Sequence, residues 1–153
     1  MSIDYGVHPA DPDHPGFCDW LASEGVEVPR EKGRFPTLAE LIETLQTFPG
    51  LAVNIDETGG TLVTLGDPEQ PGFAQMLGEI SADGTYHFTF VGSRNQGRVM
   101  AEILQKLSAT CGPLVLREQY GATPLLIHPD TDLDSALFDW QQRFKAKYPG
   151  SIG

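Results

Sequence analysis

The sequence predicts an α+β domain with a mainly antiparallel sheet of five to six strands and helices on one face. Apolar residues recur at helical spacing in two early segments and in two segments of the second half. Short runs that alternate apolar and polar residues lie between them and are separated by glycine-rich turns. Successive hairpins of this kind favour antiparallel pairing. The expected order is α-α-β-β-β-β-α-β-β-α, in a single domain over residues 1–153.

The first part of the chain predicts a lead-in followed by two helices. Residues 1–13 are rich in Pro, Asp and His, which is typical of an irregular segment. Residues 14–25 predict a helix with Asp13 as its N-cap and a proline in the first turn. Residues 37–48 predict a second helix, because they carry one apolar stripe and begin with the capping box of Thr37 and Glu40.

The middle of the chain predicts four strands. Residues 51–56 and 61–66 alternate and are joined by a tight turn, which indicates a hairpin. Residues 73–81 predict a third strand, although a short helical start is an alternative. The clearest strand is 85–91, where three aromatic residues alternate with Thr85, His87 and Thr89.

The last third of the chain predicts a helix, two strands and a final helix. Residues 94–109 carry the apolar spacing of a helix. Residues 112–118 and 123–129 predict two strands joined at 119–122. A final helix is expected to begin near Thr131, with acidic residues at its start and basic residues at its end, as the helix dipole favours.

The charge of the chain is strongly asymmetric. The net charge is −11. Residues 1–83 carry fifteen carboxylates against three basic residues, a net −12, whereas residues 84–153 carry six against seven, a net +1. Such a field repels nucleic acid and anionic membranes and attracts a basic protein, so neither nucleic acid nor membrane is an expected partner. The alternative is that the excess charge serves solubility alone.

The sequence lacks the signals of a secreted, membrane-bound, metal-binding or catalytic protein. No apolar run approaches the roughly 20 residues of a membrane helix, and the N-terminus does not resemble a signal peptide, so the predicted location is cytoplasmic. Cys18 and Cys111 are expected to be reduced and partly buried. The histidines lack zinc spacing, residues 130–135 lack the glycine and glutamate of a calcium loop, and no nucleophile motif occurs. We therefore predict no catalytic residue, metal or cofactor.

Residues 92–98, with the sequence GSRNQGR, form a candidate anion-binding loop. Backbone N–H groups at a helix start can bind an anion, and Ser93, Arg94 and Arg98 would complete such a site. The glycine spacing matches neither of the common nucleotide-binding motifs. Ser93 as a helix N-cap explains the same residues. Arg94 near the positive helix end indicates an anionic partner, which an Asp of the acidic half could supply.

Acidic residues collect in the predicted turns, where they form a candidate partner-binding surface. If the strands form a meander, several of these turns lie along one rim of the sheet, and a rim of carboxylates is suited to rapid, salt-sensitive binding of a basic protein. The alternative is that they are ordinary solvated turn residues. The predicted partner-binding residues are Asp11, Asp13, Asp56, Glu57, Asp67, Glu69 and Asp83.

Two family resemblances accompany these patterns. The segments 86–107 and 112–127 are similar in style to the immunity proteins of bacterial polymorphic toxin systems, which are small, often acidic α+β domains that block a cognate toxin. The order of elements from Thr37 onward, together with the acidic charge, resembles type III secretion chaperones, which are acidic cytoplasmic dimers that hold an effector before export. Neither resemblance implies catalytic residues.

Together these observations predict a non-enzymatic protein-binding module, a monomer or a homodimer. The first hypothesis is an immunity protein that neutralises a basic secreted toxin through its acidic half. The alternatives are an export chaperone for a secreted effector and a small anion-binding or enzymatic domain that uses residues 92–98 or His87.

Overall fold

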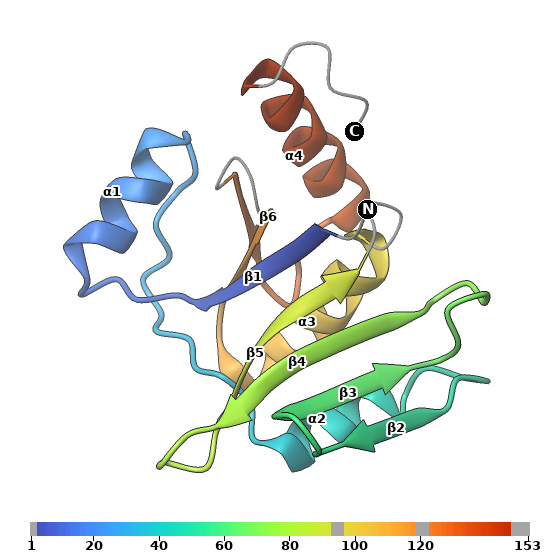
Figure 1. Ribbon diagram of the computed structural model, residues 1–153. Helices are drawn as coiled ribbons and strands as arrows, with labels where there is room; N and C mark the ends of the chain where they lie inside the picture. The colour runs from blue at the N-terminus through green and yellow to red at the C-terminus, as the bar shows by residue number, and fades with distance from the viewer. Residues whose placement is uncertain (1–2, 93–96, 119–122, 148–153) are drawn as a thin grey trace.

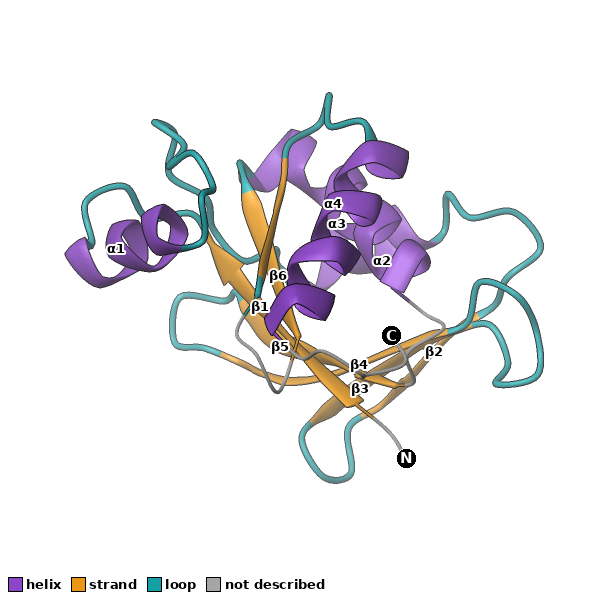
Figure 2. Cartoon of the chain, turned by 90° about the horizontal axis from the view of Figure 1, so that it is seen from above, coloured by secondary structure: helices purple, strands orange, loops and turns teal. Residues whose placement is uncertain are grey.

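The computed structural model describes residues 3–92, 97–118 and 123–147, which form four helices and one seven-stranded sheet (Figures 1 and 2). Every pair of neighbouring strands is antiparallel, in the order β2-β3-β4-β5-β1-β6-β7. The elements are β1 (Ile3–Pro9), α1 (Pro15–Ser23), α2 (Leu38–Leu45), β2 (Val53–Asp56), β3 (Thr61–Leu65), β4 (Ala74–Ile80), β5 (Tyr86–Gly92), α3 (Gly97–Cys111), β6 (Leu114–Glu118), β7 (Pro124–Ile127) and α4 (Leu133–Lys147).

The α+β class is confirmed, but the predicted strand number and element order are wrong because of β1. The supposed irregular lead-in contains a strand that lies between β5 and β6 in the sheet. Gly6 obscured this strand in the sequence, yet the glycine has a packing role. A Cβ at Gly6 would come within 3.2 Å of Arg117 Nε and 3.3 Å of His8 Nε2. The missing side chain therefore leaves room for Arg117 beside β1.

Three helices cover one face of the sheet, and α1 lies apart from them (Figure 2). Residues of α2, α3 and α4 join the core that also contains Tyr5 and Val7 of β1. His8 alternates with Val7 and so points to the opposite face, where its ring lies 5.4 Å from that of Trp20 in α1. The prediction that all helices lie on one face is therefore wrong for α1.

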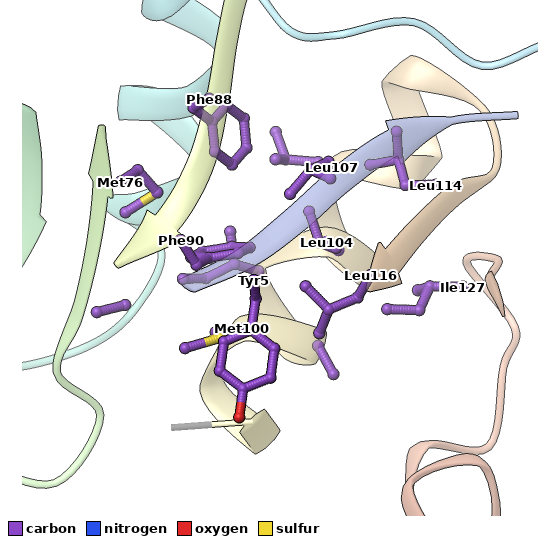
Figure 3. Packing of buried hydrophobic residues seen from close by; sticks show 14 of the residues in the cluster. Tyr5, Met76, Phe88, Phe90, Met100, Leu104, Leu107, Leu114, Leu116 and Ile127 are labelled. Carbon is purple, nitrogen blue, oxygen red and sulfur yellow. The ribbon is translucent and has the colours of Figure 1, made fainter. Parts of the chain in front are cut away.

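The core lies between α3 and the strands in the middle of the sheet (Figure 3). Phe88 and Phe90 of β5 face Met100, Leu104 and Leu107 of α3, and all five are buried. Each large apolar side chain that is removed from water in this way stabilises the fold by about 1.5–3 kcal/mol. The core therefore rests on the same alternation that identified β5 in the sequence.

The helix starts depend on local hydrogen bonds. The predicted capping box is confirmed at α2, where Thr37 Oγ1 accepts from Glu40 N and Glu40 Oε1 accepts from Thr37 N. The predicted cap of α1 is wrong by one residue, because His14 Nδ1, rather than Asp13, accepts the N–H of Phe17 at 3.1 Å. No described helix has the length and apolar character that a bilayer crossing requires.

Candidate protein-binding surface

The acidic turns that the sequence singled out lie at opposite ends of the sheet (Figure 1). Asp56 ends β2 and Glu57 follows it, and Asp83 lies in the turn between β4 and β5. Because β2 to β5 form an antiparallel meander, these two turns lie at one end. Asp67 and Glu69 lie in the loop between β3 and β4, which is at the other end. The seven carboxylates therefore do not form one continuous rim.

Asp11 and Asp13 lie in a third place, between β1 and α1. Figure 1 shows this segment beside α1, well apart from the turns of the two hairpins. Asp11 Oδ1 is 4.0 Å from Lys32 Nζ, so its charge is partly matched within the chain. Of the predicted set, Asp56, Glu57 and Asp83 remain together at one end of the sheet. We call the two loops that carry them, β2–β3 and β4–β5, the acidic turns.

In each of the acidic turns, an aspartate accepts hydrogen bonds from residues of its own loop. Asp56 Oδ1 accepts hydrogen bonds from the hydroxyl and the N–H of Thr58, at 2.6 and 2.9 Å. Asp83 Oδ1 accepts from the Ser81 hydroxyl and from the hydroxyl and N–H of Thr85. These bonds, to the hydroxyl groups first, hold the pKa of both carboxyls below its usual range. Both groups are therefore ionised at any physiological pH, in rigid and exposed turns.

Next to the acidic turns, one face of β2 to β5 has no helix over it. Figure 1 views the molecule from this side, with α2 and α3 behind the strands. The residues that point away from the core form continuous cross-strand rows: Leu62 pairs with Leu77, and Leu77 pairs with Thr89. We call this surface the open face, and its members are Asn54, Leu62, Thr64, Gln75, Leu77, His87, Thr89 and Val91.

The open face has a neutral centre and a largely acidic border. Its eight members are the uncharged residues that point away from the core on β2 to β5, and charged residues on the same side surround them. Asp56 borders it beside Leu62 on β2, Glu79 borders it on β4, and Asp4 borders it beside Val91 on β1. A neutral centre inside a charged border is the usual composition of a protein-binding surface.

Sequence reasoning missed the open face because it assigned a direction to side chains only in the strand 85–91. The same alternation in β3 and β4 was the signal that would have placed Leu62, Leu77 and Glu79 on this surface. In β5 the assigned directions are confirmed, since Tyr86, Phe88 and Phe90 are buried while His87 and Thr89 are exposed.

His87 was a candidate residue of an anion-binding or enzymatic domain, and the structure places it on the open face beside the β4–β5 turn. Its ring stacks on Phe35, with centroids 4.3 Å apart, and its Nε2 is 3.0 Å from Thr85 Oγ1. Since Thr85 donates its hydroxyl proton to Asp83, it accepts from His87 Nε2. This direction is opposite to the one a histidine needs to activate a hydroxyl nucleophile.

The candidate anion site is only partly described by the structure. Ser93 and Arg94 lie outside the described residues. Arg98, in the first turn of α3, donates to Glu102 at 3.1 Å and to Asp134 at 2.6 Å. These bonds, to Asp134 first, raise the pKa of Arg98. Its guanidinium therefore already has two carboxylate partners, which reduces its availability to a bound anion.

Other candidate sites supply little chemistry in the described part of the chain. An open groove of about 650 Å³ lies between residues 31–34 and the C-terminal end of α3. Its Arg34 is bonded by both terminal nitrogens to Glu40. Burial raises the pKa of the Cys111 thiol, so this lining residue is a poor nucleophile at neutral pH. No three metal-ligating side chains come together among residues 3–92, 97–118 and 123–147.

Comparison with known proteins identifies no relative: no family model, curated protein or solved structure matches this chain.

Proposed function

We propose that this protein is a non-enzymatic binding module that neutralises a basic protein, as an immunity protein does with its cognate toxin. The observation that carries the proposal is the group of acidic turns at one end of the sheet. Asp56 and Asp83 are fixed by bonds to their own turns, and Glu57 lies beside Asp56 on the same exposed loop. Fixed negative charges of this kind lose little side-chain freedom when a cationic surface binds them.

The excess charge of the whole chain supports the same proposal. A net charge of −11 accelerates the approach of a basic partner, and salt screens this attraction over about 10 Å at 0.1 M ionic strength. Association with the partner is therefore fast at low salt and slows as salt is added. An acidic border also repels nucleic acid, whose binding proteins depend on basic patches and aromatic stacking platforms. The aromatic side chains of β5 point into the core instead.

Binding to the product of the adjacent gene tests this proposal. That product is expressed and purified, and the rate of its association with this protein is measured at low and high salt. We expect a complex whose association rate falls steeply with salt. The variant Glu57→Gln/Asp83→Asn should reduce the association rate about tenfold or more at low salt, because it removes two charges from the contact.

The matched control is Asp67→Asn/Glu69→Gln, which removes two charges from the opposite end of the sheet. We expect this control to change the association rate by less than about threefold, since those carboxylates lie far from the acidic turns. A complex that responds equally to both double variants would contradict the role of the acidic turns. The absence of a complex at low salt would contradict the proposed function.

A further inference from the structure

The open face carries one exposed leucine, Leu77, beside the half-buried aliphatic side chains of Leu62 and Val91. Leu77 is 42% exposed in the middle of β4, directly opposite Leu62 on one side and Thr89 on the other. Val91 lies one pair further along β5, opposite Gln75. Leu62, Leu77 and Val91 lie on three neighbouring strands, Leu62 opposite Leu77 and Val91 diagonal to it, so the exposed leucine is the centre of a small apolar patch.

Other exposed apolar residues of the molecule lack this arrangement. Ile80 is 49% exposed, but it pairs with the core residue Tyr86 and so points to the helix side at the end of β4. Ile55 pairs with the buried Val63 and likewise points to the helix side. Phe138, on α4, is 65% exposed. The open face is distinguished by the contact of Leu77 with a second leucine, Leu62, directly opposite it, and by Val91 on the diagonal.

We infer that the open face, centred on Leu77, is the contact core for the basic partner, and that the partner presents an aliphatic segment flanked by lysine or arginine. This inference rests on the proposed function and adds the chemistry of the partner to it. The aliphatic patch requires an apolar counterpart, while Thr64, Gln75 and Thr89 supply neutral hydrogen-bonding groups around it.

The charge of the border determines which occupant the open face accepts. Asp4, Asp56 and Glu79 lie on three sides of the neutral centre, and on the fourth side Arg117 of β6 follows Gly6 in the row of Leu77 and Thr89. A second copy of this chain would bring two acidic borders together, which costs free energy through like-charge contact. Cationic residues on either side of an aliphatic centre instead complement both parts of the surface.

The contact core lies close enough to the acidic turns for one partner to touch both. Asp56 pairs directly with Leu62, and Leu62 pairs with Leu77, so a carboxylate and the aliphatic patch lie on adjacent strands. Neighbouring strands are about 4.8 Å apart. A partner that is steered by the acidic turns therefore meets the aliphatic patch within two strand spacings.

A set of short peptides, mixed with the isotope-labelled protein and followed by amide chemical shifts, tests this inference. The probe is Lys-Lys-Leu-Val-Leu-Lys-Lys. The comparison peptides are Lys-Lys-Gly-Ser-Gly-Lys-Lys, which keeps only the charge, and Glu-Glu-Leu-Val-Leu-Glu-Glu, which reverses it. We expect the probe to shift amides of β3, β4 and β5 and to bind at least about fivefold more tightly than either comparison peptide.

Two variants with matched exposure locate the contact. Leu77→Gln should weaken binding of the probe by about fivefold or more, because it places an amide in the contact core. Ile80→Gln, on the same strand but on the other side, should leave the affinity unchanged. Both side chains are about half exposed, so neither substitution threatens the fold.

Each other outcome overturns a specific part of the account. Shifts confined to the acidic turns, with Leu77→Gln binding normally, would overturn the contact core and leave the proposed function standing. Failure of both cationic peptides to bind, while the product of the adjacent gene binds, would overturn the inference alone; failure of the gene product as well would contradict the proposed function. Equal binding of the acidic peptide would overturn the charge complementarity. Concentration-dependent shifts on the open face without any peptide would show that a second copy occupies it.

Discussion

The two faces of one sheet carry side chains of opposite character in this protein. On β5, Phe88 and Phe90 are buried under α3, whereas His87 and Thr89, their neighbours in sequence, are exposed on the open face. The covered face binds the helices and supplies the apolar burial that stabilises the domain. The open face contributes little burial and keeps its aliphatic patch in contact with water. On the function proposed above, one face is constrained by folding and the other by an external partner.

The largest predicted effect compares two adjacent residues of β5. Phe90→Ala should lower the free energy of unfolding by about 3–5 kcal/mol, because it leaves a cavity between the sheet and α3. Thr89→Ala, on the open face, should change it by less than about 0.5 kcal/mol. Urea unfolding of the two variants measures both values. Similar losses in both would show that the open face is also part of the structural core.

A smaller effect is expected where the covered face buries a polar group. The Tyr86 hydroxyl lies 2.5 Å from the carbonyl oxygen of Thr61 and 3.1 Å from that of Met76, and burial raises its pKa to about 12. Tyr86→Phe should cost about 1–2 kcal/mol in unfolding free energy, because it removes a buried hydrogen bond. An unchanged unfolding free energy would contradict this bonding. Thr64→Val, which removes a hydroxyl on the open face, is the matched control and should change the unfolding free energy by less than about 0.5 kcal/mol.

Helix α2 packs on the covered face. Substitution of Glu40 at its start should lower the free energy of unfolding by about 1 kcal/mol. Glu40 bonds Arg34 and the Thr37 N–H, which lowers its pKa from 4.5 to about 2. Because the folded state favours the carboxylate, this stabilisation is present above pH 4.5 and is lost as the pH falls toward 2. Glu40→Gln should reduce the unfolding free energy at neutral pH and flatten its decline over that acidic range. A variant with an undiminished acid response would exclude Glu40 as its source.

The smallest predicted effect concerns His8, on the part of the other face that α1 adjoins. Burial, and then the charge of Arg117, lower the pKa of His8 below 6.5. The folded state therefore favours neutral imidazole, and stability falls as the pH drops from 6.5 toward the pKa of the folded protein. Urea unfolding between pH 7 and 5 should show this fall in the native chain and a weaker one in His8→Gln. Equal pH dependence in both proteins would contradict the burial of His8 against Trp20 and Arg117.

The elements that sequence analysis predicted well are those defined by local signals. The capping box of Thr37 and Glu40 and the aromatic alternation of β5 depend on residues a few positions apart. Strand β1 was missed because its partners are far away in the chain, at β5 and β6. Its Gly6 leaves room for Arg117, which reaches it from the neighbouring strand. The number of strands therefore depended on a contact that no local pattern reports.

For the candidate surface, too, the sequence predicted local features but not how they are grouped in the fold. Turn chemistry placed Glu57 and Asp83 in turns and Asp56 directly before one, but strand pairing decides which turns share an end of the sheet. The packing of α2 and α3 on one face then decides which side of β4 exposes Leu77. Individual residues were thus available from the sequence, whereas their grouping required the fold.

The central claim is that the covered face stabilises the domain and the open face binds a basic partner, and one paired measurement on Leu77→Gln tests it most directly. The unfolding free energy in urea and the affinity for Lys-Lys-Leu-Val-Leu-Lys-Lys are measured on the same sample. The account predicts an unfolding free energy within about 0.5 kcal/mol of the native chain and an affinity about fivefold weaker or more. A loss of several kcal/mol in unfolding free energy, with unchanged affinity for the peptide, would contradict it.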